Sequence, residues 1–322
     1  MTDNKRAEVY LAALLHDIGK FYQRADNLIA EVVKDNQHLK LLSEMICPIN
    51  DSGSFGYQHA FWTYKFFEDN ADKVFNKIKE NGKEVFYLNK YDGRSDDNLP
   101  NLAAFHHKPQ TKLQAMIQLA DWWSSGMERV TERLEKEEAP DYGKFRYKKV
   151  PMFSPFNSIN NGNFSNAYSF VPLSLTDQCF PSDGMLKTDF KNTDRKIFEE
   201  KYQELWKGFT ERLRELPRDS FSGFAESLLF LLKNFTWTIP ASTNDMADVS
   251  LYEHLKTTAA IADCFYQYED EMPESFVWEK GVKKPNFSEG NYPLMLCCWD
   301  LSGIQDFLYN IAGSKAAVSL KG

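Results

Sequence analysis

The chain has 322 residues, of which 43% are hydrophobic and 15% aromatic, so it can build a large core in two or three domains. Its net charge of −8 and pI of about 5.4 exclude a surface that is basic throughout, although a local basic groove or a metal ion would still supply positive charge. The lack of a run of roughly 20 apolar residues, of a signal peptide and of any C-x-x-C pair predicts a cytoplasmic protein without a membrane span or a structural zinc site.

The first predicted element is a helix over residues 7–24, which contains the adjacent pair His16 and Asp17. His16 continues the apolar face that Val9 and Ala13 begin, so it points to the buried side with Asp17 beside it. Because a helix turns about 100° per residue, both side chains can lean into one pocket. An imidazole nitrogen and a carboxylate oxygen suit a divalent ion such as Mn, Fe, Co, Ni or Zn. The alternative is a core histidine beside a solvated aspartate.

Further histidines follow in settings that suit metal binding. His59 shares a helical face with aromatic residues within 57–67. His106 and His107 lie at the end of a predicted helix, because Pro109 disfavours helical geometry at the residue before it. Each of these histidines, taken alone, also fits a core or surface position.

A periodic helix is predicted over residues 110–138, and Asp121 lies on its apolar face. Burial of an unpaired carboxylate is costly, so Asp121 requires a metal ion, an arginine such as Arg129, or a histidine, and a structural ion pair is the alternative to a metal site. His254 precedes an alanine-rich helix like the one beneath His16, which makes it a candidate ligand or a neighbour of one.

Proline and polar residues interrupt the helical pattern over residues 140–193, which predicts an extended connector with short strands at 150–152 and 168–175. Residues 144–149 mix basic and aromatic side chains, which fits either contact with a nucleic acid or a solvated linker. Helices are predicted again over 196–215 and 221–234.

Near the C-terminus, the apolar run 292–299 has the length and flanks of a buried strand, and residues 300–309 predict a turn and a helix after it. One strand and one helix cannot close a domain. This piece therefore opens a truncated domain or is completed by other material.

Several motifs, taken in order, resemble one known family. They are Leu15-His16-Asp17-Ile18-Gly19-Lys20-Phe21 with Gln23-Arg24, Tyr57-Gln58-His59-Ala60, His106-His107-Lys108, Ala120-Asp121-Trp122-Trp123-Ser124-Ser125, the segment 250–260 around His254, and Asp300-Leu301-Ser302-Gly303. This order resembles the N-terminal HD domain and the first palm segment of the large signature subunit of type III-A CRISPR effector complexes.

The resemblance implies a mainly α fold, with a permuted HD-type helical domain followed by the start of an α+β, ferredoxin-like palm domain. It divides the chain into an HD nuclease domain over 1–139, a connector over 140–193, a helical segment over 194–285 that packs on or completes the HD domain, and the first strand and helix of a truncated palm over 286–322. The second palm domain of the family, which helps to make cyclic oligoadenylate from ATP, is missing from this sequence. ATP is therefore expected as a cofactor only of the full-length family member.

In function, the resemblance implies antiviral CRISPR interference in which the HD domain cuts single-stranded DNA as an endonuclease or exonuclease. One or two ions of Mn, Ni, Co or Fe are expected as cofactors, and guide RNA and small effector subunits as partners, with no membrane. The candidate metal ligands are His16, Asp17, His59, His106, His107, Asp121 and His254, the candidate catalytic residues are His16, Asp17 and Lys20, and the candidate nucleotide-binding residues are Asp300, Ser302 and Gly303.

Three alternatives stay open at this point. Lys20, one helical turn after His16, would steady a phosphate group or else extend to solvent as a surface lysine. The chain would also fit an HD phosphohydrolase of small nucleotides, which a sealed pocket would favour. It would further fit a non-catalytic scaffold of the ribonucleoprotein complex, which a failure to bind metal would favour.

Overall fold

The structure is a computed structural model that describes residues 4–26, 29–49, 55–88, 96–125, 145–158, 166–184, 189, 191–243, 247–268, 294–298, 300 and 302. Met1–Phe287 form one compact unit and Ser288–Gly322 a second. The described helices are α1 (Asn4–Leu15), α2 (Ile18–Ala25), α3 (Ile29–Val33), α4 (Gln37–Ile46), α5 (His59–Asn70), η1 (Phe75–Lys77), α6 (Leu99–Ala104), η2 (Phe105–His107), α7 (Lys112–Ser125), α8 (Arg146–Lys149), η5 (Pro155–Ser158), η6 (Asp177–Cys179), α9 (Arg195–Leu213), α10 (Phe221–Thr236) and α11 (Leu251–Gln267). Among the described residues the one sheet is an antiparallel pair, β1 (Lys79–Glu80) with β2 (Lys83–Glu84), so the mainly α prediction is confirmed.

The prediction of a single helix over residues 7–24 is wrong. Helix α1 ends at Leu15 and α2 begins at Ile18, so His16 and Asp17 form a turn between the two helices. Asp17 has φ −110° and ψ 12°, outside helical geometry, and its carbonyl accepts a hydrogen bond from the Lys20 N–H at 2.9 Å. Tertiary packing overrides the local helical period here, because α1 packs against α11, α6 and α7 whereas α2 packs against α5 and α9.

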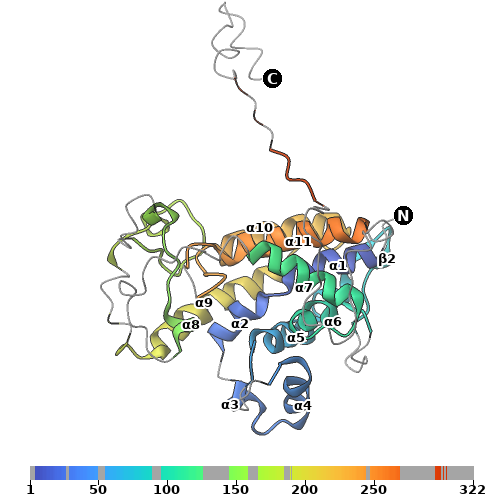
Figure 1. Ribbon diagram of the computed structural model, residues 1–322, viewed down its shortest axis with the longest axis horizontal. Coiled ribbons are helices and arrows are strands. Elements are labelled where there is room, and N and C mark those ends of the chain that lie inside the picture. Colours follow the sequence, from blue (N-terminus) through green and yellow to red (C-terminus); the bar gives the residue numbers. More distant parts are fainter. Residues whose placement is uncertain are drawn as a thin grey trace, which may run out of the picture. The chain divides into compact units, whose positions relative to one another are not determined.

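Helix α1 lies within the first unit, with neighbours on several sides (Figure 1). Its second half is apolar all round, and the five residues Leu11, Ala12, Ala13, Leu14 and Leu15 are fully buried. A helix that is apolar on every side belongs in a core. The alanines allow α11 to approach α1 closely, and α11 in turn packs against α7. The end of α1 is thereby surrounded by helices from distant parts of the sequence.

The helices expected in the second half of the chain are present. Helices α9 and α10 correspond to the predicted segments 196–215 and 221–234. Helix α7 begins at Lys112 and is described as far as Ser125, so the rest of the predicted helix over 110–138 lies outside the described residues.

Below α5 in Figure 1, the short helices α3 and α4 lie at the edge of the core. Apolar residues of these two short helices, including Val33, Leu42 and Ile46, pack with Phe61 and Trp62 of α5. This contact gives the first turn of α5, which begins at His59, a packed support on one side.

In the connector, the predicted strands at 150–152 and 168–175 are wrong. The described residues there form only isolated bridges, in which Ala167 pairs with both Phe153 and Ser182. The solvated-linker interpretation of residues 144–149 is also wrong, because Lys148 of α8 is fully buried. Its ammonium group lies 2.6 Å from the Glu199 carboxylate of α9. A buried charge requires such a partner, so this ion pair ties the connector to α9.

In the second unit the described residues are 294–298, 300 and 302. The described part of the predicted buried strand has no strand geometry, and Met295 and Leu296 are 84% and 97% exposed. A strand requires a neighbour for its backbone hydrogen bonds, and residues 294–298 have none among the described residues. The palm assignment and the four-part domain division stay predictions.

No helix in the described part of the chain is long and apolar enough to cross a membrane.

Candidate metal centre

The turn between α1 and α2 points both His16 and Asp17 inward, and their exposed fractions are 0% and 1%. Two contacts with α5 hold this turn. The Thr63 hydroxyl donates to the His16 carbonyl at 2.8 Å, and the Gly19 N–H donates to the Thr63 hydroxyl oxygen at 3.1 Å. A Cβ atom at Gly19 would lie 1.9 Å from the His59 carbonyl oxygen. Only glycine permits this close approach, which brings the first turn of α5 to Asp17.

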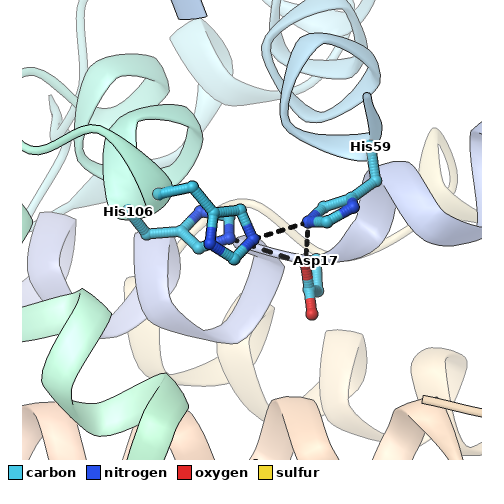
Figure 2. A group of neighbouring side chains, drawn as sticks. Asp17, His59 and His106 are labelled. Atoms are coloured by element: carbon cyan, nitrogen blue, oxygen red, sulfur yellow. Dashed lines mark hydrogen bonds and ion pairs between the residues drawn. The ribbon is translucent and has the colours of Figure 1, made fainter. Parts of the chain in front are cut away.

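One oxygen of Asp17 faces a group of histidines from α5 and η2 (Figure 2). Oδ1 lies 3.1 Å from His59 Nε2 and 3.7 Å from His106 Nε2. His59 Nε2 also lies 2.8 Å from His107 Nε2. We call Asp17, His59, His106 and His107 the first donor group, because each offers one ligand atom and these atoms all lie within 4.8 Å of one another.

The other oxygen of Asp17 faces His16 of the same turn and residues from α7 and α11. Oδ2 lies 3.4 Å from His16 Nε2 and 3.2 Å from His254 Nε2. Asp121 Oδ1 lies 3.5 Å and 3.2 Å from the same two nitrogens. We call His16, Asp17, Asp121 and His254 the second donor group; its ligand atoms meet the same 4.8 Å limit. Asp17 is the one residue that belongs to both groups.

Hydrogen bonds on the outer nitrogens orient three of these histidine rings. His16 Nδ1 lies 2.7 Å from the Ala13 carbonyl oxygen, and His106 Nδ1 lies 2.6 Å from the Ala103 carbonyl oxygen. A carbonyl accepts only, so Nδ1 carries a proton in both rings and Nε2 is the nitrogen that faces the centre.

The third ring is oriented by a serine. The Ser124 hydroxyl donates to the His254 carbonyl at 3.1 Å, and its oxygen lies 3.2 Å from His254 Nδ1. Because the hydroxyl proton is used on the carbonyl, the oxygen accepts from Nδ1–H, and Nε2 is again the nitrogen that faces the centre. Such outer hydrogen bonds are the usual support of metal-binding histidines.

The two carboxylates are held ionised although they are buried. Burial acts to raise the pKa of Asp17, but Lys20, with its ammonium 2.6 Å from Oδ2, and His16 outweigh it and hold that pKa well below its ordinary value. For Asp121, burial is likewise outweighed by hydrogen bonds from His16 and His254, and the pKa is again well below its ordinary value. Both groups are therefore charged at neutral pH, as metal ligation requires.

The histidines of the first donor group are held neutral. Burial lowers the pKa of His59, and burial together with neighbouring histidines lowers the pKa of His106 to about 3 and that of His107 well below its ordinary value. For His16, burial lowers the pKa but the charges of Asp17 and Asp121 raise it by more. The first group thus combines neutral imidazoles with an anionic oxygen, which is the donor chemistry that binds divalent transition metals.

Two atoms at the centre support a metal directly. Asp17 Oδ1 and His106 Nε2 are buried, and neither has a hydrogen-bond partner among the residues that the structure describes. A buried polar atom without a partner costs free energy, and a divalent cation would satisfy both atoms at once. The residues present therefore fit a metal ion at the first donor group, and the second donor group offers a matching set around the other oxygen of Asp17.

A cavity of about 660 Å³ lies beside the centre. His59, His107 and Asp121 form part of its wall, and Lys20 and Arg24 form another part. The Arg24 guanidinium is almost fully buried and donates to three backbone carbonyls, at distances of 2.6, 2.8 and 3.1 Å. The cavity thus has two cationic side chains in its wall beside the candidate metal centre.

The structure brings together all seven residues that the sequence suggested as metal ligands, with Lys20 at their edge. Of the suggested nucleotide-binding residues, Asp300 and Ser302 are exposed in the second unit, and Gly303 lies outside the described residues. Arg129, the suggested partner of Asp121, also lies outside the described residues. The sequence interpretation missed the positioning roles of Ser124, Thr63 and Gly19. The motif strings that contain Ser124 and Gly19 were visible, but the partners of these residues lie on other helices.

Two curated relatives match nearly the whole length of this chain. A protein of Methanocaldococcus jannaschii named "CRISPR system single-strand-specific deoxyribonuclease Cas10/Csm1 (subtype III-A)" is 29% identical over 99% of this chain and 36% of its own length. A protein of the same name from Enterococcus italicus is 27% identical over 99% of this chain and 37% of its own length.

The chain matches the N-terminal part of Cas10/Csm1, the large subunit of type III-A CRISPR systems. The resemblance seen in the motifs is thereby confirmed. The chain spans little more than a third of the length of these two Cas10/Csm1 relatives. A solved Csm1–Csm4 cassette in complex with cA4 is 18% identical, with a TM-score of 0.46 over 82% of this chain and 28% of that chain. No protein-family model matches the chain.

Proposed function

We propose that this chain carries the metal-dependent nuclease centre of a type III-A CRISPR large subunit and hydrolyses phosphodiester bonds of single-stranded DNA. The observation that carries the proposal is the placement of Asp17 between two donor groups, with Asp17 Oδ1 and His106 Nε2 buried and without a hydrogen-bond partner among the described residues. The names of the Cas10/Csm1 relatives, which are single-strand-specific deoxyribonucleases, support the substrate class.

The residues divide the work as follows. Asp17 would contact ions in both groups, His59, His106 and His107 would complete the first set, and His16, Asp121 and His254 the second. Mn, Ni, Co or Fe would each suit these donors, and the ions, when bound, would supply the Lewis acidity for phosphodiester hydrolysis at neutral pH.

Substrate binding would rest on the cavity wall. Lys20 reaches this wall with a side chain that is 22% exposed, and its ammonium group would pair with a phosphate oxygen. The buried charge of Arg24 lies in the same wall and would add to the attraction for the phosphate backbone. The chain as a whole has a net charge of −8, and these two cations supply local positive charge where an anionic strand would bind.

Other parts of the proposal concern the whole family member. We expect assembly with guide RNA and small effector subunits in the cytoplasm, and synthesis of cyclic oligoadenylate from ATP through the palm domains of the full-length family member. The exposed residues Asp300 and Ser302, together with Gly303, would contribute to nucleotide binding only within a completed palm domain.

The test compares the purified chain with Asp17→Asn on a labelled single-stranded DNA oligonucleotide, with Mn²⁺, Co²⁺ or Ni²⁺ and with EDTA. We expect metal-dependent cutting that falls to background in Asp17→Asn, together with loss of bound metal from both donor groups. Asp121→Asn should lose metal only from the second group. His38→Asn is the matched control, because His38 is an exposed histidine paired with Glu68 away from the centre.

Each failure has a distinct meaning. Cutting that survives EDTA or Asp17→Asn contradicts the proposed centre. Metal binding without cutting, but with hydrolysis of nucleoside triphosphates, would assign a small-nucleotide substrate instead. A chain that binds no metal and cuts nothing would be a scaffold.

A further inference from the structure

Tyr57 sits on the rim of the cavity in an unusual conformation. The residue is 56% exposed although it is large and aromatic. Its backbone has φ 47°, in the left-handed region that residues other than glycine, asparagine and aspartate rarely adopt. Such strain persists where the surrounding structure fixes the residue, and it gathers at functional sites. The backbone strain at Tyr57 is therefore not explained by burial of its side chain in the core.

The ring of Tyr57 is held on the metal centre. It stacks on His107 with a centroid distance of 3.9 Å and an interplanar angle of 27°. It also meets the edge of His59 at 6.1 Å and 86°. One ring face thus rests on a residue of the first donor group, while the residue as a whole is more than half exposed and lines the cavity. The result is a fixed aromatic surface directly beside the candidate reaction site.

The same cavity carries the complementary features of a single-strand site. Lys20 and Arg24 bring positive charge to one part of its wall, and the aromatic residues Trp122 and Tyr147 line it elsewhere. Proteins that hold single strands combine a basic path for the backbone with aromatic rings on which bases stack. A base in a duplex is stacked and paired within it, whereas a base in a single strand can turn onto a protein ring.

We propose that Tyr57 is a nucleobase platform that stacks on the base beside the scissile phosphate and thereby positions single-stranded DNA over the first donor group. The inference rests on the proposed nuclease function and adds a specificity-determining residue to it. Stacking needs the ring and not the hydroxyl, and it needs a base at one position of the strand. If the ring only braced His107, DNA binding would not depend on a base at any one position of the strand.

The experiment measures KM and kcat for a labelled single-stranded oligonucleotide with Mn²⁺, for the wild type, Tyr57→Phe and Tyr57→Asn. Phenylalanine keeps the ring. Asparagine removes the ring but tolerates the left-handed backbone, so this variant is expected to fold. We expect Tyr57→Phe to behave as the wild type within about twofold. We expect Tyr57→Asn to raise KM roughly 5- to 100-fold with little change in kcat or in bound Mn²⁺.

Two further arms separate a platform from a brace. A single abasic position, moved along the oligonucleotide, should weaken the wild type at one distance from the cut and should not weaken Tyr57→Asn further at that position. Binding of the oligonucleotide in EDTA, followed by fluorescence anisotropy, should rank the three proteins in the same order as KM.

An unchanged KM in Tyr57→Asn overturns the platform, as does a defect that is equally large with the abasic strand. Loss of bound Mn²⁺ from Tyr57→Asn without a change in DNA affinity would make Tyr57 a brace for His107, which also overturns it. If the wild type cuts no DNA with any metal, the proposed function fails, and the anisotropy arm still decides whether Tyr57 binds a base.

Discussion

Substitution of Gly19 by alanine tests whether the close approach of α2 and α5 builds the metal centre. The new Cβ would lie 1.9 Å from the His59 carbonyl oxygen and 2.5 Å from the Thr63 backbone nitrogen. Ordinary contacts of this kind are about 3.5 Å, so the two helices would have to separate by roughly 1.5 Å. Both obstacles are backbone atoms, and no change of side-chain rotamer can relieve them.

The magnitude follows from two opposing terms. Overpacking of a core costs about 1–3 kcal/mol, occasionally more, and a rigid backbone clash belongs at the upper end. Alanine recovers about 1 kcal/mol of helix propensity over glycine. We expect Gly19→Ala to lower the free energy of unfolding by about 2–3 kcal/mol. Because His59 moves away from Asp17, we also expect weaker metal binding at the first donor group.

The assay is guanidinium unfolding in EDTA followed by circular dichroism, with metal titration of the folded protein by calorimetry. Gly223→Ala is the matched control, because its Cβ would meet only the Ser220 hydroxyl oxygen at 3.0 Å, and we expect a change within about 1 kcal/mol. The reasoning is refuted if Gly19→Ala is as stable as Gly223→Ala and binds metal as the wild type does.

Two other predictions concern the histidines. Ser124→Ala should weaken metal binding at the second donor group by roughly 10- to 100-fold, because His254 loses the partner of Nδ1. Calorimetric titration with metal would measure this loss. The control is Ser125→Ala, which removes a hydroxyl bonded to a backbone carbonyl and should leave the metal affinities of both donor groups unchanged. The free energy of unfolding in EDTA should fall as the pH drops from 7.5 to 5, because folded His106, with its pKa lowered to about 3, stays neutral while the unfolded histidine takes up a proton. Protonation of this histidine in the unfolded state lowers the free energy of unfolding by about 2 kcal/mol at pH 5. The raised pKa of His16 acts in the opposite direction. A pH slope of stability that is the same in His106→Gln as in the wild type would contradict the prediction.

The sequence by itself determined which kinds of side chain are available for the centre, and whether each lies on a buried helix face or at a helix end. An aspartate on the apolar face of a helix, as at Asp121, signals a missing cation because an unpaired buried charge is too costly. The apolar period around His16 and the proline after His107 placed these residues correctly at a buried face and at a helix end. These are local properties, and the order of the motifs then pointed to the right family.

Tertiary structure alone decided how the residues combine. The turn at His16 and Asp17 interrupts what the local period predicts as one helix, because α1 and α2 pack against different neighbours. His254 joins His16 across 238 residues of sequence. The sharing of Asp17 by two donor groups depends on the approach that Gly19 permits. Helical periodicity reports which face of a segment is buried, but only packing between segments determines which buried groups meet there.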